Sequence, residues 1–170
     1  MERINPDKPP RAVVWGNHPA VVDAATQTMQ EMKVQVVERV RLKEILNEQK
    51  VRLINTSDDE AELLKVGRLL GADQIVFADA AVLSEEVQRI VDSYGGFSQA
   101  ETVYQLSVSV RNTSVETGEL RWSGTATYPK PVTNRDEGLI DLTRHAMSHA
   151  VCPLENGYTW DERAGCRKPQ

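Results

Sequence analysis

Apolar residues recur along the chain with two different periods, and the change of period divides the chain into two halves. The first half contains a short apolar run over 11–16, which suits a buried strand, and a second brief segment over 35–38. These two segments alternate with stretches in which apolar residues recur at helical spacing. This pattern predicts strands in those two places and helices over 19–32, 39–49 and 60–70.

The second half begins with residues 74–83, which are apolar almost throughout and are typical of a central strand. Strict alternation then follows in 104–111 and 120–128, on either side of a turn that contains Gly118, and predicts a hairpin with one solvated face. A last helix is expected over 136–151. The order of elements predicts an α/β fold, a mixed sheet of about five strands with parallel units first and an antiparallel meander second, flanked by helices.

The length of 170 residues suits a single domain. We expect a flexible leader over 1–10, a single α/β domain over 11–151 and a C-terminal tail over 152–170. The leader is polar and rich in proline, and the tail has little regular pattern of its own.

The net charge of −5 argues against general affinity for nucleic acid or for an anionic membrane surface. No apolar stretch approaches the roughly 18 residues that span a bilayer. The residues after Met1 do not resemble a signal peptide. We therefore expect membrane contact only through an N-terminal lipid anchor that precedes this chain.

Three segments together carry a resemblance to a known group of proteins. Residues 38–49, 66–77 and 115–124, in this order, resemble the envelope lipoprotein superfamily of the curli-secretion channel subunit. This superfamily also holds the lipoprotein activators of penicillin-binding proteins and the N-terminal domain of the Tol-system propeller protein. The resemblance covers roughly residues 11–150 and implies a scaffold for protein contacts, because its motifs serve helix starts, helix ends and turns.

The resemblance implies a non-enzymatic bacterial cell-envelope protein without a cofactor. We expect an outer-membrane lipoprotein that faces the periplasm at the inner face of the outer membrane and binds or regulates another envelope protein. An adaptor is favoured over a pore, because the long insertion 84–101 carries Glu85, Glu86, Arg89 and Asp92 and no apolar band. Two alternatives stay open: a component of an envelope secretion assembly, and a homo-oligomer.

Asp141, His145 and His149 are the best candidates for chemistry, because their spacing places them on one side of the last helix. Two histidines at this spacing can chelate a metal, with Asp141 as a third ligand, so a metal-binding protein or a hydrolase is a further alternative. A solvated helix face is the simpler interpretation, since no Glu follows His145 as hydrolytic zinc motifs require.

Two other residues invite a functional interpretation. His18 follows the first strand, where α/β folds often place ligands, but it precedes Pro19 and is better explained as a helix cap. Asp79 lies within an apolar strand, where burial would raise the pKa of its carboxyl group. Such a residue could serve as a functional acid, but it more often marks a solvated sheet face or pairs with a neighbouring arginine or backbone amide.

The tail and the long insertion supply the last two predictions. If the protein is exported, Cys152 and Cys166 are expected to form a disulfide that fastens the tail to the last helix. Tyr94 and Phe97 flank a double glycine that is typical of a hairpin turn, so both should lie near the tip of an extended loop. Two roles stay open there: the aromatics contact a partner, or the tip folds back and Phe97 packs into the domain's own surface.

Overall fold

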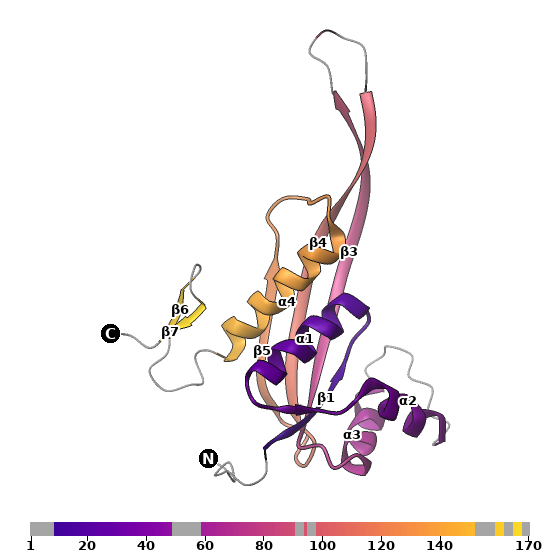
Figure 1. Ribbon diagram of the computed structural model, residues 1–170, viewed down its shortest axis with the longest axis vertical. Coiled ribbons are helices and arrows are strands. Elements are labelled where there is room, and N and C mark those ends of the chain that lie inside the picture. Colours follow the sequence, from indigo (N-terminus) through magenta and orange to yellow (C-terminus); the bar gives the residue numbers. More distant parts are fainter. Residues whose placement is uncertain are drawn as a thin grey trace.

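A computed structural model describes residues 9–48, 59–90, 94, 98–151, 159–161 and 165–167. Five strands form one sheet in the order β2-β1-β3-β4-β5 (Figure 1). Their bounds are β1 (Arg11–Trp15), β2 (Gln35–Val36), β3 (Gln74–Ile90), β4 (Ser98–Ser114) and β5 (Leu120–Thr127). β1 is parallel to both of its neighbours, whereas β3, β4 and β5 are antiparallel. The predicted mixed sheet and its hairpin are confirmed.

Within the described residues four helices accompany the sheet, each within one residue of its predicted bounds. They are α1 (Pro19–Glu31), α2 (Arg39–Glu48), α3 (Asp59–Leu69) and α4 (Arg135–Val151). None of the helices in the described part of the chain is long and apolar enough to cross a membrane.

The helices cover the sheet in two layers, because successive residues of a strand point to opposite faces. Val76 and Ala78 of β3 belong to a buried cluster with α1 and α4. Ile75 and Phe77 belong to a second cluster with α2 and α3 on the other face. α1 and α4 lie side by side along the sheet, while α2 and α3 cover only its end near β1 (Figure 1). The rest of that second face is open to solvent, as the alternation predicted.

β3 and β4 are much longer than the sequence pattern indicated. Strands were expected over 74–83 and 104–111, with a loop between them, but each strand has 17 residues and they pair without interruption from Gln74↔Ser114 to Ile90↔Ser98. We call residues 83–90 of β3 and 98–105 of β4, together with Tyr94 between them in the sequence, the arm. The arm extends well beyond the helices (Figure 1). Its residues are mostly polar on both faces, so the sequence there lacks the alternation of apolar and polar residues that a half-buried strand shows. Backbone pairing alone defines the strands in the arm.

The C-terminal tail also differs from expectation. β6 (Thr159–Asp161) and β7 (Gly165–Arg167) pair antiparallel in a small second sheet. The sequence pattern did not predict this pair of strands. Three-residue strands are too short for a periodic signal to emerge from the sequence.

Candidate functional site

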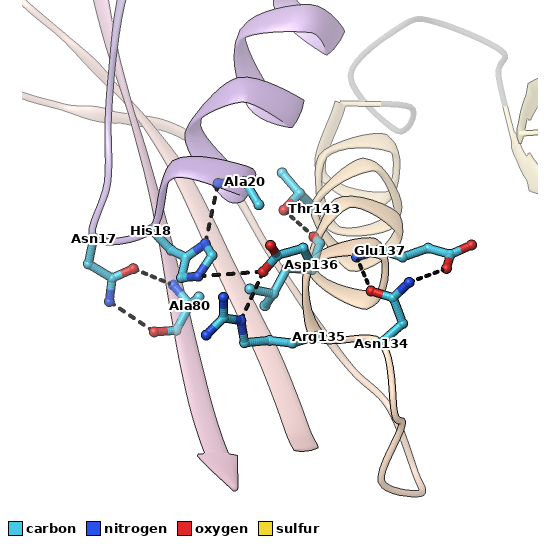
Figure 2. A network of polar contacts seen from close by, with 10 residues as sticks. Asn17, His18, Ala20, Ala80, Asn134, Arg135, Asp136, Glu137 and Thr143 are labelled. Atoms are coloured by element: carbon cyan, nitrogen blue, oxygen red, sulfur yellow. Dashed lines mark hydrogen bonds and ion pairs between the residues drawn. The ribbon is translucent and has the colours of Figure 1, made fainter. Parts of the chain in front are cut away.

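Residues 16–18 connect β1 to α1 and bind the neighbouring strand over a long sequence distance. β1 pairs with β3 as far as Trp15↔Phe77. Beyond that point the side chain of Asn17 makes the hydrogen bonds to β3 that a further strand residue would make. Its Nδ2 donates to the carbonyl oxygen of Ala80 at 2.9 Å, and its Oδ1 accepts from the Ala80 N–H at 2.8 Å (Figure 2). Asn17 therefore fixes the position at which the chain enters α1.

His18 caps α1, as predicted. Its backbone is extended (φ −135°, ψ 129°), and its Nδ1 accepts a hydrogen bond from the Ala20 N–H at 3.3 Å. Pro19 occupies the first helical turn, where the missing N–H costs nothing. The other ring nitrogen, Nε2, lies 3.9 Å from Oδ1 of Asp136 at the start of α4 (Figure 2). The ring thus lies between the N-termini of two helices.

The start of α4 holds a reciprocal cap that the sequence analysis missed. Oδ1 of Asn134 accepts from the Glu137 N–H at 3.2 Å, and Nδ2 of Asn134 donates to the Glu137 carboxylate at 2.8 Å. An Asn followed three residues later by Glu is a signature of a helix start, so the signal was present in the sequence. Arg135 donates to Asp136 at 2.8 Å, and this hydrogen bond lowers the pKa of the Asp136 carboxyl group. These contacts tie two helix starts together.

Asp79 precedes Ala80, the partner of Asn17, and lies on the open face of the sheet. Partial burial raises the pKa of its carboxyl group above the ordinary 3.8, against the opposing effects of Arg111 and of a hydrogen bond from the Asn17 backbone. The Arg111 guanidinium lies over the Phe77 ring at 4.3 Å and pairs with Glu60 at 2.8 Å. Asp79 is exposed on this face, and its carboxyl group accepts a hydrogen bond from a backbone N–H, as the simpler interpretation of the residue expects. The arginine has two other contacts, which leaves Asp79 incompletely compensated.

The substitution Asp79→Asn is expected to raise the melting temperature at neutral pH. A carboxyl group whose pKa is higher in the folded state binds its proton more tightly there than in the unfolded chain. The free energy of unfolding therefore falls as the pH rises above 3.8, the ordinary pKa of an aspartate. Asparagine does not titrate, and its advantage over the wild type should grow as the pH rises from below 3.8 and then level off. Thermal melts across this pH range measure the difference.

Asp136→Asn is the control, because the pKa of Asp136 is shifted in the opposite direction. Its melting temperature should fall below that of the wild type at neutral pH and converge with it in acid. Two variants with the same pH trend would contradict the assignment of the two shifts.

A second candidate site lies between α4 and the edge strand β5. A cavity of about 530 Å³ is lined there by Thr125, Ala126, Thr127, Tyr128, Asp141, Leu142, His145 and His149. The two histidine rings lie with their centroids 4.6 Å apart. Burial, followed by the charges of Asp141 and Glu137, raises the pKa of the Tyr128 hydroxyl. The predicted spacing therefore brings the two histidines together beside the cavity.

Asp141 lines the same cavity but does not complete a three-ligand site. In the described part of the chain, no three His, Cys, Asp or Glu side chains are placed together to hold a metal ion. The arrangement is unlike the three-ligand sites of hydrolytic zinc enzymes.

The remaining predicted residues lie on the arm and in the tail. Tyr94 is 97% exposed beyond the paired strands. Phe97 lies outside the described residues. The pair Cys152 and Cys166 also cannot be placed, since Cys152 and the side chain of Cys166 fall outside them. The disulfide and the contact role of the two aromatics stay predictions. The sequence analysis overlooked Leu83, which is 73% exposed at the base of the arm.

Comparison with known proteins identifies the group to which this architecture is similar. The family described as curli production assembly/transport component CsgG matches residues 24–132, which include all three segments that carried the resemblance. The resemblance is confirmed. No curated protein sequence matches the chain.

Several solved structures are similar to this chain. Lipoprotein GNA1162 from Neisseria meningitidis is 18% identical with a TM-score of 0.53, over 83% of this chain and 96% of that chain. The C-terminal domain of LpoB from Salmonella enterica is 16% identical with a TM-score of 0.45, over 71% and 83% of the two chains. PelC from Paraburkholderia phytofirmans, a dodecamer, is 12% identical with a TM-score of 0.45, over 81% and 84%.

Proposed function

Because this chain belongs to the family of curli production assembly and transport components, we propose that it is a non-enzymatic protein of the bacterial cell envelope that binds or regulates another envelope protein. In this proposal it faces the periplasm at the inner face of the outer membrane. GNA1162, whose fold it shares, is a lipoprotein. We extend that property to this chain, with the anchor upstream of Met1.

The arm is the observation that carries this proposal. Past the bridge between Tyr104 and Val132, no strand in the described residues pairs with the outer edges of the arm. An isolated two-stranded ribbon is only marginally stable in water, and unpaired strand edges readily accept another chain. The unpaired edges of the arm are therefore suited to binding a partner protein.

The chemistry of the arm indicates what such a partner offers. Leu83 is 73% exposed and Tyr94 is 97% exposed, and exposed aromatic and aliphatic side chains serve as anchors in interfaces. The other described side chains include Glu85, Glu86, Glu101 and one arginine, Arg89, which pairs with Glu101 at 3.0 Å. The surface of the arm is therefore acidic around two apolar points. A complementary partner surface has an apolar recess rimmed by lysine or arginine.

A second function is supported by the description of the family. As a component of an envelope secretion assembly, the protein would use the same arm to contact other subunits, including copies of itself. The two functions differ in what lies against the arm, an unrelated envelope protein or another copy of this chain.

Photo-crosslinking from position 94 in the membrane-anchored protein distinguishes the two functions, because mass spectrometry then identifies the partner. We expect Leu83→Ser, and Tyr94→Ser combined with Phe97→Ser, to weaken binding to that partner about tenfold or more. The melting temperature should stay unchanged, since neither Leu83 nor Tyr94 is buried. Binding by the purified proteins and thermal melts give the two quantities.

Leu120→Ser is the matched control, since Leu120 is 59% exposed on the same sheet at the end remote from the arm. Binding should be unaffected by this change. Unaltered association of the arm variants together with a lowered melting temperature would show that these side chains stabilise the domain itself, and the binding function of the arm would be wrong.

A further inference from the structure

α4 presents two imidazole rings at the mouth of the cavity beside β5. His145 and His149 are one helical turn apart, both are exposed, and their ring centroids are 4.6 Å apart. The adjoining side of the helix packs against the sheet through Leu142, Ala146 and Ala150. The backbone that carries the two rings is therefore held rigidly by the core.

The separation of the rings suits a shared metal ion. A tetrahedral zinc ion bound at 2.0–2.1 Å holds two histidine nitrogens about 3.3 Å apart and their ring centroids about 5 Å apart. The observed 4.6 Å differs from this by an amount that a small rotation of one ring supplies. Chelation needs no change in the backbone of α4.

We propose that His145 and His149 chelate a divalent transition-metal ion. The protein supplies two imidazole nitrogens, and water or a side chain of another molecule fills the remaining positions. No third ligand from the described residues joins the pair, so we expect the ion to exchange readily. Imidazole ligands favour copper, nickel and zinc over magnesium and calcium, and copper(II) should bind most tightly of the divalent series.

Calorimetric titration of tag-free protein with zinc chloride, and then with copper(II) chloride, tests the proposal. The cysteines are reduced and alkylated beforehand, so that Cys152 and Cys166 cannot supply thiolate ligands. We expect one ion per chain. His145→Ala and His149→Ala should each weaken binding about tenfold or more, because each leaves a single imidazole.

The third histidine of the chain provides the control. His18→Asn removes an imidazole but keeps a good helix cap, so metal binding should be unchanged. Circular dichroism of the two alanine variants checks that α4 remains folded. Equal affinity in the wild type and His149→Ala, or no saturable binding in the wild type, would overturn the proposal.

Discussion

Replacing Gly16 by alanine is expected to lower the free energy of unfolding by about 3 kcal/mol, the upper end of the usual range for overpacked sites. A Cβ atom at this position would lie 1.9 Å from the carbonyl oxygen of Ala78 and 2.9 Å from Cγ2 of Val22. The carbonyl belongs to the backbone of β3 and cannot swing aside as the end of a side chain would. Thermal unfolding should show a melting temperature roughly 6–12 °C lower, since 1 kcal/mol corresponds to about 2–4 °C in a chain of this size.

Gly118→Asn separates this steric effect from the general cost of replacing a glycine. Gly118 has φ +72°, and a Cβ atom there would meet nothing closer than Cδ1 of Leu64 at 3.8 Å. Asparagine tolerates this left-handed conformation, so the loss should be below about 1 kcal/mol. Equal losses at the two positions would contradict the close approach of residue 16 to β3.

The sequence predicted the elements of the domain well wherever burial imposes a period. Each helix has an apolar side that packs on the sheet, and each of the four was placed within one residue of its observed bounds. Strand β3 was predicted correctly only up to Leu83. After this residue, neither face of the strand is covered by a helix, so apolar and polar residues no longer alternate with burial. Strand pairing that depends on backbone hydrogen bonds leaves little trace in a single sequence.

The candidate sites divide in the same way between local and long-range features. His18 was identified as a cap because its signal, a proline at the next position, is local. The pairing of Asn17 with Ala80 bridges 63 residues, and the contact of His18 with Asp136 joins two helix starts from opposite halves of the chain. Neither contact can be predicted from the spacing of residues in the sequence, because the tertiary fold alone brings these residues together.

The arm and the histidine pair lie on different elements, and this separation allows their roles to be tested independently. The arm is an extension of β3 and β4, whereas the pair lies on α4 beside β5. A variant of Leu83 should therefore leave metal binding unchanged, and a variant of His149 should leave the surface of the arm unchanged.

The substitution Leu106→Ala should lower the free energy of unfolding by about 2–5 kcal/mol, as is usual when a buried leucine is truncated. Leu106 is fully buried in β4, and its Cδ1 lies so close to Gly138 that a Cβ atom there would approach it to 2.7 Å. The first turn of α4 thus rests directly on this side chain, and truncation leaves a cavity that the rigid sheet cannot close. Chemical denaturation measures the loss.

Leu83→Ala is the matched control, because it removes the same atoms from a leucine on the adjacent strand that is 73% exposed. This change should alter the stability by no more than about 0.5 kcal/mol, as is usual for surface positions. The slope of the denaturation curve should be the same for both variants, because each unfolds the same sheet. A comparable loss in the two variants would mean that α4 does not cover β4 as described, since burial beneath the helix is what distinguishes Leu106 from Leu83.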